Sequence, residues 1–269
     1  MSSEKRTPEE VRAYWTDAAT KSVDQDGLRP TARDPFLQQA VEDAMERLIG
    51  PGARLLDVGC GDGESTCRFA VRAANVVGVD YIDEYVERSV KLAKDRGITN
   101  ASFMTGDVQD LSPVIEKHGL FDIATSIRCL INLTDWDMQK RGLHQIASCV
   151  KPGGLYVTSE GWTDGVDGLN RMRERRGLPP FNVVGYNRTM TRLAFEEEAR
   201  EDFIIEDYVS LGFYIFMSRV FQPAFTAPEQ PRHDHDINRI AADLQNMPEM
   251  RGVFDSCDYA GVYVLRRKG

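Results

Sequence analysis

One short segment restricts the fold of this chain more than any other. Residues 55–58 read Leu-Leu-Asp-Val, a pattern typical of a buried strand, and glycines follow at 59, 61 and 63 before a helix begins near Glu64. Glycine allows the tight turn that joins such a strand to a helix, and it lets a ligand approach the backbone closely. The N-terminus of the helix adds unpaired N–H donors. The segment therefore predicts a strand–turn–helix unit with a ligand site at the turn.

From Arg54 onward, short β-rich runs alternate with amphipathic helices. Such alternation predicts an α/β fold with a parallel sheet and helices on both of its faces. The continuously apolar run at 76–79 agrees with strands that are buried on both sides. The expected strands are 54–58, 75–79, 101–104, 121–126 and 155–159, and the expected helices lie near 64–73, 83–96, 110–117 and 136–150.

The remaining segments are expected to surround this core within a single domain. Two helices precede it, one capped by Thr7 and one opened by Asp34-Pro35. After Glu160 we expect irregular structure as far as residue 180, then a helix over 189–202. Two antiparallel strands then close the sheet. The expected strands are 203–219 and 259–266, with an insertion at 220–258. The chain would then divide into N-terminal lid helices (1–52), a ligand-binding core (53–160) and a wall with the closing strands (161–269).

Composition argues against several classes of protein. The net charge is -9, whereas a nucleic-acid-binding protein needs a basic face that displaces counterions from phosphates. The first ten residues are too polar for a secretory signal peptide, and no apolar run approaches the length of a membrane span. Five scattered cysteines favour a reducing compartment over a disulfide framework. We therefore expect a cytoplasmic protein that binds neither nucleic acid nor membrane.

The glycine-rich segment and four later motifs resemble the class I S-adenosylmethionine-dependent methyltransferases. Leu-Leu-Asp-Val-Gly-Cys-Gly-Asp-Gly at 55–63 matches the first motif of that family nearly letter for letter, and Asp80 ends the next strand. Gly-Asp-Val at 106–108, Phe-Asp-Ile-Ala at 121–124 and Val-Lys-Pro-Gly-Gly at 150–154 follow in the family's order. The resemblance covers 53–160 and implies a Rossmann-like, doubly wound, seven-stranded, mostly parallel sheet with an antiparallel C-terminal strand.

A dinucleotide-binding oxidoreductase is the alternative interpretation of the glycine turn. The dinucleotide fingerprint is Gly-x-Gly-x-x-Gly, whereas this chain has Gly-x-Gly-x-Gly at 59–63. Asp57 would also meet a pyrophosphate unfavourably, because both are negatively charged. An acid suits a ligand with an ammonium or sulfonium group better, which favours the methyltransferase interpretation.

The resemblance further implies how the chain binds S-adenosylmethionine and its product S-adenosylhomocysteine. The glycines of the first motif would flank the methionine part, and Asp80 would hold the ribose. Asp107 would meet the adenine, which Tyr81 and Val108 would sandwich. The full set of implied cofactor-binding residues is Asp57, Gly59, Gly61, Gly63, Asp80, Tyr81, Asp107, Val108, Ile127 and Arg128.

Transfer of a methyl group to oxygen needs a base, and histidine is the commonest one. His118 and His144 fit a surface turn and the packed side of a helix. His233 and His235 lie in the C-terminal insertion, and we expect the insertion to cover the acceptor pocket and one of these histidines to be the base. A polar loop before a helix capped by Asp236 explains these two histidines about as well.

Glu160, at the end of the fifth strand, is a third candidate for a catalytic role. Together with the alternating His/Asp run at 233–236 it offers the ligand types of a divalent metal site. The second acid pair of metal-dependent members of the family is absent, so we expect no metal.

Arginines and aromatic residues outside the core are candidates for binding the acceptor. Arg29 and Arg33 are candidates for contacting either the cofactor carboxylate or an anionic acceptor. Tyr14 belongs to the first lid helix, and Tyr214 and Arg219 belong to an aromatic run in the C-terminal part. The arginines at 171–176 are more simply explained as a solvated face.

Together these patterns predict an enzyme that methylates a small polar or carbohydrate-like acceptor. Oxygen is the favoured acceptor atom, and nitrogen is the second choice. Lid helices, the segment after the fifth strand and the insertion all enlarge the walls of one pocket. The alternatives are an RNA or protein methyltransferase and a non-catalytic module that only binds the cofactor. The acidic charge counts against RNA, as does Ser-Ile-Arg-Cys at 126–129 in place of an Asn-Pro-Pro-Tyr-type motif. The sequence leaves open whether the chain forms a homodimer.

Overall fold

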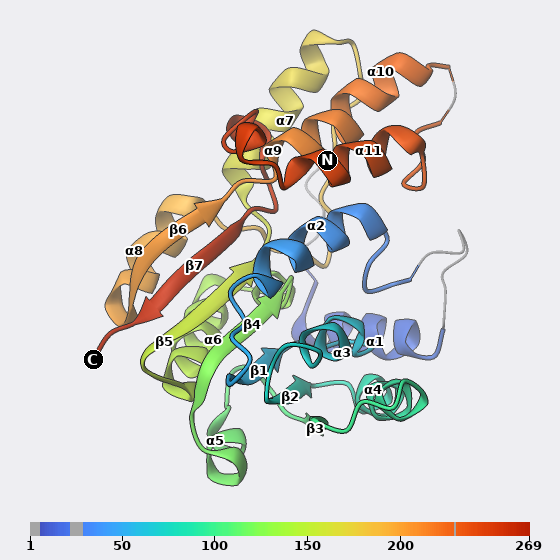
Figure 1. The fold of residues 1–269 in the computed structure, drawn as a ribbon. Helices are drawn as coiled ribbons and strands as arrows, with labels where there is room; N and C mark the ends of the chain where they lie inside the picture. Colours follow the sequence, from blue (N-terminus) through green and yellow to red (C-terminus); the bar gives the residue numbers. More distant parts are fainter. Residues whose placement is uncertain (1–5, 22–28, 229) are drawn as a thin grey trace.

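A seven-stranded sheet forms the centre of the computed structural model, which describes residues 6–21, 29–228 and 230–269 (Figure 1). The strand order is β3-β2-β1-β4-β5-β7-β6. Strand β7 runs antiparallel to both of its neighbours, and the other neighbouring strands are parallel. This confirms the predicted fold class. The strands are β1 (Arg54–Val58), β2 (Asn75–Asp80), β3 (Ala101–Thr105), β4 (Phe121–Ile127), β5 (Val150–Ser159), β6 (Phe203–Val209) and β7 (Val262–Arg267).

The order of the strands reverses between β1 and β4. In an open sheet of this kind, ligands bind outside the carboxyl ends of the strands at such a switch point. The glycine turn follows β1, and residues 128–132 follow β4, so both loops lie at this edge. The topology therefore places a ligand site between them.

Helices cover both faces of the sheet. One face is covered by α2 (Pro35–Glu46), α3 (Glu64–Phe69) and the C-terminal helices, and the other by α5 (Ser112–His118), α6 (Trp136–Cys149) and α8 (Arg192–Asp202). Successive side chains of a strand point to opposite faces, so the fully buried Leu55 joins the first core and Leu56 joins the second. Helix α4 (Asp83–Asp95) packs beside β2 and β3.

Both N-terminal helices begin as predicted. Thr7 caps α1 (Pro8–Ala19) in a capping box with Glu10, and Asp34 caps α2 through Leu37 N–H. The expected lid region also includes residues 1–5 and 22–28, which lie outside the described residues.

Two expectations for the C-terminal part were wrong. Residues 163–175 form helix α7 (Thr163–Arg175) where we expected irregular structure. The glycines of this helix allow close packing. A Cβ at Gly168 would stand 1.5 Å from Ser256 O, and a Cβ at Gly165 would stand 1.9 Å from Asp258 O. The backbone of α7 thus packs directly against the backbone of the 3₁₀ turn η4 (Asp255–Cys257).

The second error concerns the expected strand 203–219, which ends at Val209. The aromatic run at 213–219 and the residues after it are helical. They form α9 (Gly212–Phe216), the π-helix η2 (Met217–Phe221) and α10 (Gln222–Thr226). The buried residues Leu211, Tyr214, Ile215 and Ser218 have the spacing of a helix and not of a strand. The insertion continues as α11 (Asp236–Gln245), which packs against α2.

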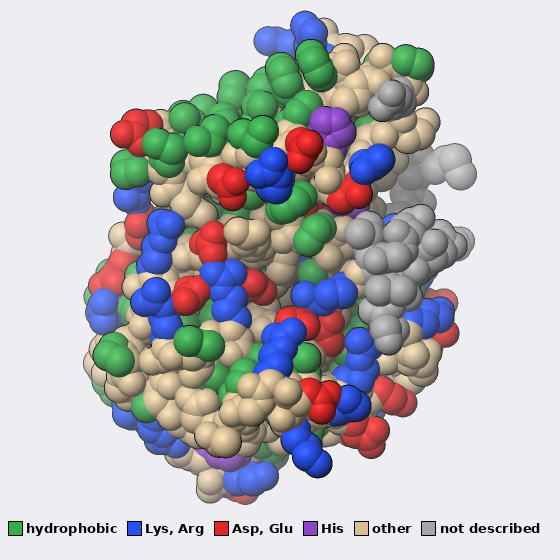
Figure 2. Space-filling view, turned by 45° about the vertical axis from the view of Figure 1, so that its right-hand side comes forward, with side chains coloured by type: hydrophobic (Ala, Val, Ile, Leu, Met, Phe, Trp, Pro, Cys, Tyr) green, Lys and Arg blue, Asp and Glu red, His purple; other side chains and the backbone are tan. Residues whose placement is uncertain are grey.

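Hydrophobic side chains gather at the end of the molecule that is formed by α7 and the C-terminal helices, whereas the remaining surface in this view mixes both charges (Figure 2). Phe221, Phe225, Ile240 and Leu244 are among the exposed apolar residues of these elements. Among the described residues, no helix combines the length and apolar character that crossing a membrane requires.

Candidate functional site

Glycines in the left-handed region shape the loop after β1. Gly59 has a φ of 72° and Gly61 a φ of 53°, values that residues with a side chain rarely adopt. A Cβ at Gly59 would stand 2.8 Å from the sulfur of Cys129. The loop after β1 therefore approaches the loop after β4 more closely than any other residue type would allow.

Asp57 lies inside β1, directly below this turn. It accepts hydrogen bonds from the hydroxyls of Thr66 (2.5 Å) and Thr125 (2.9 Å). Burial raises its pKa to about 6, because the low polarity around the group disfavours its charged form.

Asp80 ends β2 and ties the glycine loop to it. Its carboxylate accepts hydrogen bonds from the backbone N–H groups of Gly61 (2.9 Å) and Ile82 (3.0 Å). Burial raises the pKa of Asp80 to about 6 as well. The site thus holds two buried acids beside a glycine turn, a charge pattern that favours a cationic ligand.

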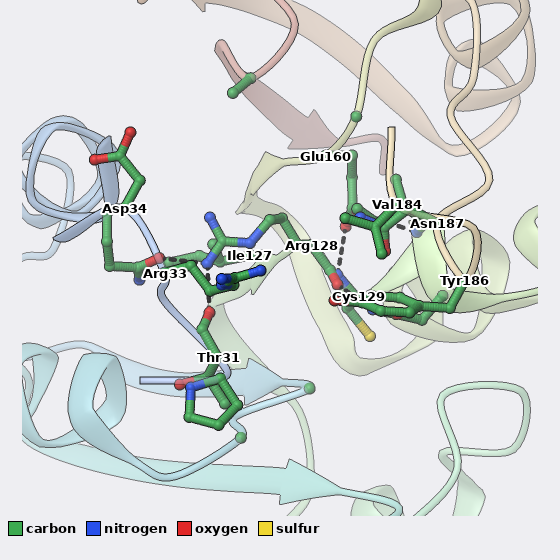
Figure 3. A pocket seen from close by; sticks show the side chains of 18 of the residues that line it. Thr31, Arg33, Asp34, Ile127, Arg128, Cys129, Glu160, Val184, Tyr186 and Asn187 are labelled. Atoms are coloured by element: carbon green, nitrogen blue, oxygen red, sulfur yellow. Dashed lines mark hydrogen bonds between the residues drawn. The ribbon is translucent and has the colours of Figure 1, made fainter. Parts of the chain in front are cut away.

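A cavity of about 350 Å³ opens at this edge of the sheet. It brings together most of the predicted site residues. Those that line it are Arg29, Arg33, Asp57, Gly59, Gly61, Asp80, Tyr81, Ile127, Arg128, Glu160, Arg219 and His233. Those that do not are Tyr14, Gly63, Asp107, Val108, Tyr214 and His235. Figure 3 shows part of the cavity, where Arg33 and Arg128 lie near each other between Thr31 and the loop after β4.

Asp107 and Val108 follow β3 outside the lining. The exposed Asp107 accepts a hydrogen bond from Gln109 N–H (2.9 Å) and so forms a turn. Val108 is buried in the core beside α6. Their contact with adenine stays a prediction. Gly63, with a φ of 80°, is the N-cap of α3 and faces Ser89.

Glu160 is buried, and its carboxylate holds the loop after β4. It accepts hydrogen bonds from three successive backbone N–H groups, those of Cys129 (3.2 Å), Leu130 (3.1 Å) and Ile131 (3.1 Å). Ser126 Oγ donates a further one (3.0 Å). Burial raises the pKa of Glu160, although these donors favour the charged form. A carboxylate with this many donors positions a loop and is poorly placed to accept a proton from a substrate.

Arg128 begins this loop in a strained conformation. Its φ is 54°, in the left-handed region, which is uncommon for a residue with a side chain. Its guanidinium donates to Thr31 O (2.7 Å) and Gln38 Oε1 (2.6 Å). Burial lowers the pKa of Arg128.

Asp34, which the sequence identified only as a helix cap, also lines the cavity. Its carboxylate accepts a hydrogen bond from Tyr214 Oη (2.7 Å) and pairs with Arg219 (2.5 Å). His233 Nδ1 lies 3.7 Å from it. Burial opposes the charge of Asp34, but the charge of Arg219 and the hydrogen-bond donors around the carboxylate together outweigh burial and lower the pKa of Asp34. No sequence pattern pointed to this cluster, because Asp34 is far from Arg219 along the chain.

The two candidate histidines have different places. His233 lines the cavity, whereas His235 is the N-cap of α11. His235 Nδ1 accepts a hydrogen bond from Ile237 N–H (3.1 Å). The predicted cap at Asp236 was therefore wrong by one residue, since Asp236 is already inside the helix.

A roof of aromatic residues covers one side of the cavity. Tyr14 in α1 stacks on Tyr186, with ring centroids 4.2 Å apart, and donates a hydrogen bond to its hydroxyl (3.2 Å). Trp15 Nε1 donates to Asn132 Oδ1 (2.9 Å) in the loop after β4. Three separate segments thus meet over the site.

Arg29 is already paired. It donates to both carboxylate oxygens of Asp62, from Nε (3.0 Å) and Nη2 (2.8 Å), which fixes the N-terminal segment against the glycine loop. This bidentate geometry is the strong form of an arginine–carboxylate contact. Arg29 therefore secures the wall of the site.

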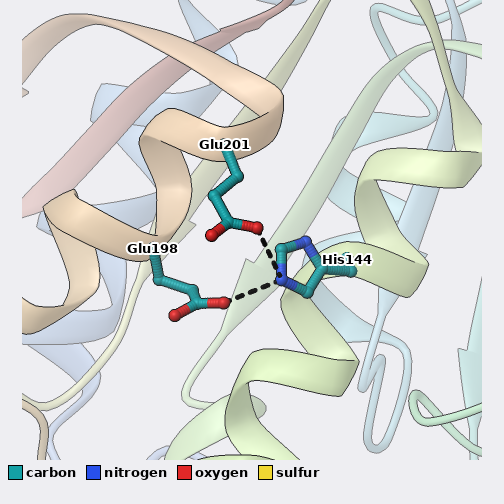
Figure 4. Close-up of side chains that lie close together, drawn as sticks. All are labelled: His144, Glu198 and Glu201. Atoms are coloured by element: carbon teal, nitrogen blue, oxygen red, sulfur yellow. Dashed lines mark hydrogen bonds and ion pairs between the residues drawn. The ribbon is translucent and has the colours of Figure 1, made fainter.

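A second group of ionisable residues lies outside this cavity (Figure 4). Ligand atoms of His144, Glu198 and Glu201 lie within 4.8 Å of one another. Both ring nitrogens of His144 are hydrogen-bonded to carboxylates, Nδ1 to Asp202 (2.6 Å) and Nε2 to Glu198 (2.8 Å). These contacts join α6 to α8 and account for the cluster as a structural clamp.

The comparisons with known proteins agree with this geometry. Residues 55–154 match the model of the family described as a methyltransferase domain. The chain is 29% identical to the sterol 24-C-methyltransferase of Pneumocystis carinii over 136 residues, which are 48% of this chain and 34% of that protein. It is 38% identical to the 23S rRNA (uracil(1939)-C(5))-methyltransferase of Klebsiella pneumoniae over 78 residues, 29% and 18% of the two chains.

A third relative is the ubiquinone biosynthesis O-methyltransferase of Bordetella avium. It is 33% identical over 106 residues, which are 38% of this chain and 40% of that protein. The chain spans well under two thirds of the length of all three relatives. Their acceptors differ widely by name, so the matches concern the domain that they share.

Among solved structures, magnesium protoporphyrin IX methyltransferase from Synechocystis PCC 6803, with bound S-adenosylhomocysteine, superposes with a TM-score of 0.62. The match covers 97% of this chain and all of that chain (100%) at 15% identity, which is a likeness of fold. Fold, glycine turn and family match agree. Residues 55–154 match a methyltransferase domain, and the chain has the fold of the class I S-adenosylmethionine-dependent methyltransferases.

Proposed function

We propose that this chain transfers a methyl group from S-adenosylmethionine to a small polar acceptor, with oxygen as the favoured acceptor atom and nitrogen as the second choice. The observation that carries the proposal is the glycine turn beside Asp57 and Asp80, at the switch point of a sheet whose core matches a methyltransferase domain. The cofactor supplies a methyl group on a sulfonium sulfur, and loss of that group leaves a neutral thioether.

The residues of the site fit this cofactor. Asp57 and Asp80 are buried acids, and both line the cavity. They favour a ligand that carries ammonium and sulfonium charges, because opposite charges attract strongly where water is scarce. An ionised Asp80 has lone pairs to accept hydrogen bonds from two ribose hydroxyls. The left-handed glycines keep side chains away from the turn at which the ligand would lie.

The other residues that line the cavity suit a small acceptor. They include Arg33, Phe181, Tyr186, His233 and Tyr259, which come from segments far apart in the chain. A volume of about 350 Å³ is within the range of small-molecule sites. The net charge of -9 disfavours RNA as the acceptor, because RNA binding needs a positive surface.

His233 is the proposed base for an oxygen acceptor. Its Nδ1 faces the carboxylate of Asp34 at 3.7 Å, and among the described residues its Nε2 has no hydrogen-bond partner. A carboxylate beside one ring nitrogen orients the ring and leaves the other nitrogen to accept the proton. His235 is not proposed as the base, because its Nδ1 is bonded to the backbone of α11.

We also propose a cytoplasmic location. All five cysteines are free, and four of them are buried. Free thiols in this number suit a reducing compartment.

The first experiment measures ligand binding by isothermal titration calorimetry. We expect the wild-type protein to bind S-adenosylhomocysteine and not NAD. Binding of NAD alone would support a dinucleotide-binding oxidoreductase. Methyl-labelled cofactor is then offered with panels of small hydroxyl compounds, amines and RNA. Transfer to RNA would make the chain an RNA methyltransferase, and binding without any transfer would make it a non-catalytic cofactor-binding module.

The second experiment compares the two histidines on whichever acceptor is labelled. His233→Gln should lower kcat by about 100-fold or more, as removal of a general base does, without weakening S-adenosylhomocysteine binding. His235→Asn is the matched control, since asparagine also caps helices well, and it should keep wild-type kcat. Full turnover by a folded His233→Gln protein would assign the base elsewhere.

A further inference from the structure

Arg128 is a cation at the cavity with only neutral partners. Its Nη2 donates to Thr31 O and Gln38 Oε1, and among the described residues no carboxylate forms an ion pair with it. A guanidinium that is removed from water without a counter-charge is costly. Its Nε and Nη1 form no hydrogen bond with the described residues and remain donors for an anion.

The other arginines of the cavity differ from Arg128. Arg29 is bound bidentately by Asp62, and Arg219 is paired with Asp34. Arg33 is exposed and lies outside the core, before α2. The geometry therefore singles out Arg128 as the arginine that is held inside the site and lacks a carboxylate.

The place of Arg128 indicates which end of a ligand it meets. Thr31, which accepts its hydrogen bond, lies against the glycine loop, since a Cβ at Gly61 would stand 3.1 Å from Thr31 Cγ2. Thr31 Oγ1 also donates to Asp62 (3.0 Å). The guanidinium is thus tethered through Thr31 to the N-terminal segment that packs on the glycine turn.

The strained backbone of Arg128 is held by Glu160. Three successive N–H groups after Arg128 donate to this carboxylate, and Arg128 N–H donates to Ser159 O (2.8 Å). Asn132 Nδ2 donates back to Arg128 O (2.6 Å). Left-handed residues with side chains persist only where such contacts over-determine them, and they cluster at ligand clamps. Figure 3 shows Glu160 reaching this loop from the side opposite Thr31.

We propose that Arg128 binds the carboxylate of the cofactor's amino-acid part, and that Glu160 is the positioning residue that aims it. The proposal rests on the proposed function and assigns one contact within it. It replaces the expectation that Arg29 or Arg33 meets this carboxylate. It also gives Glu160 a role other than that of a base or a metal ligand.

The test uses two ligands that differ by one group. S-adenosyl-3-thiopropylamine is S-adenosylhomocysteine without its carboxylate. We expect wild-type protein to bind S-adenosylhomocysteine about 10- to 100-fold more tightly than this amine, the range of a charge-assisted contact. Arg128→Gln should bind the two ligands within about threefold of each other, and the amine as the wild type does. Arg33→Gln is the matched control and should keep the wild-type ratio.

Each result supports or overturns the proposal. Wild-type protein that binds neither ligand would refute the proposed function itself. Equal wild-type affinities, or a ratio that survives Arg128→Gln, would refute the carboxylate contact and leave the proposed function standing. Loss of the ratio in Arg33→Gln instead would move the contact to Arg33. Arg128→Lys keeps the charge on a single nitrogen and should give an intermediate ratio, which serves if Arg128→Gln fails to fold.

Glu160→Gln tests the positioning role by the same ratio. The amide keeps the size of the side chain but brings N–H groups against backbone donors, so the loop should lose its conformation. We expect the ratio to fall to about threefold or less, with the affinity for the amine retained. An equal loss for both ligands would show that Glu160 supports the fold and does not aim Arg128.

Discussion

The hydrogen-bond and ion-pair partners of four buried acids determine the structural role of each acid. Asp80 accepts two backbone N–H groups and Glu160 accepts three, so both shape loops. Asp57 accepts two threonine hydroxyls inside the sheet, and Asp34 is paired with Arg219. The sequence identifies Asp57 and Asp80 because each belongs to a short motif that can be read along the chain. It identifies neither the loop that Glu160 holds nor the arginine at Asp34, because these contacts form only when distant segments meet.

Substitution of Gly59 tests a prediction at the scale of single residues, and substitution of Gly97 is the matched control. Both have positive φ, 72° and 67°, but a Cβ would meet Cys129 at Gly59 and open space at Gly97. Gly97→Ala should cost about 1 kcal/mol of unfolding free energy from backbone strain, and Gly59→Ala about 2–4 kcal/mol because overpacking is added. Urea unfolding measures both.

The same two variants separate strain from ligand binding. Gly59→Ala should also weaken S-adenosylhomocysteine binding more than tenfold in calorimetry, while Gly97→Ala should bind normally. Equal costs and equal affinities for the two variants would contradict the close contact between the loops after β1 and β4.

At the scale of elements, sequence patterns identified the strands and helices of the core well. Their periods are unambiguous there, and the first motif fixes the register of β1 and α3. The pattern failed in the C-terminal part for a physical reason. Gly165 and Gly168 resemble loop residues but allow α7 to approach η4, and the aromatic run at 213–217 has enough apolar residues for either a strand or a helix. Only packing in the assembled core determines which secondary structure such segments form.

The contact between α6 and α8 gives a pH-dependent prediction at this scale. Partial burial lowers the pKa of His144, but the hydrogen bonds and charges of Asp202 and Glu198 outweigh it and raise the pKa. A raised pKa in the folded state means that the stabilisation is present below the unfolded value of about 6.5 and is lost as the pH rises through the folded value. The charged clamp therefore stabilises the fold in mildly acidic solution.

His144→Gln should remove this contribution. Because the side chain of His144 is 35% exposed, solvent screening limits the effect. The loss of unfolding free energy should be larger at pH 5.5 than at pH 9 by about 0.5–1 kcal/mol. His118→Gln is the control, since burial and the charges of Lys117 and Arg54 lower the pKa of His118. A His144→Gln loss that is the same at both pH values would show that the clamp does not depend on charge.

At the scale of the whole molecule, the site is closed by segments that only the complete fold brings together. Tyr14 in the first helix and Tyr186 in the wall after α7 are 172 residues apart, yet they stack and share a hydrogen bond over the cavity. Trp15 fixes the same helix to Asn132. These contacts hold the N-terminal helix against the wall at one side of the cavity, and we therefore expect this roof to retain a bound ligand.

Tyr14→Ala should open this roof. Loss of the stacked ring removes the contact between the first helix and the wall, so we expect S-adenosylhomocysteine to dissociate about tenfold faster with little change in its association rate. Stopped-flow fluorescence measures both rates, because Trp15 lines the cavity. Tyr14→Phe keeps the stacked ring and should dissociate nearly as slowly as the wild type. Val71→Ala, at a position that is 80% exposed, is the control for surface truncation. If Tyr14→Ala slowed association and left dissociation unchanged, the first helix would guide entry of the ligand and would not retain it.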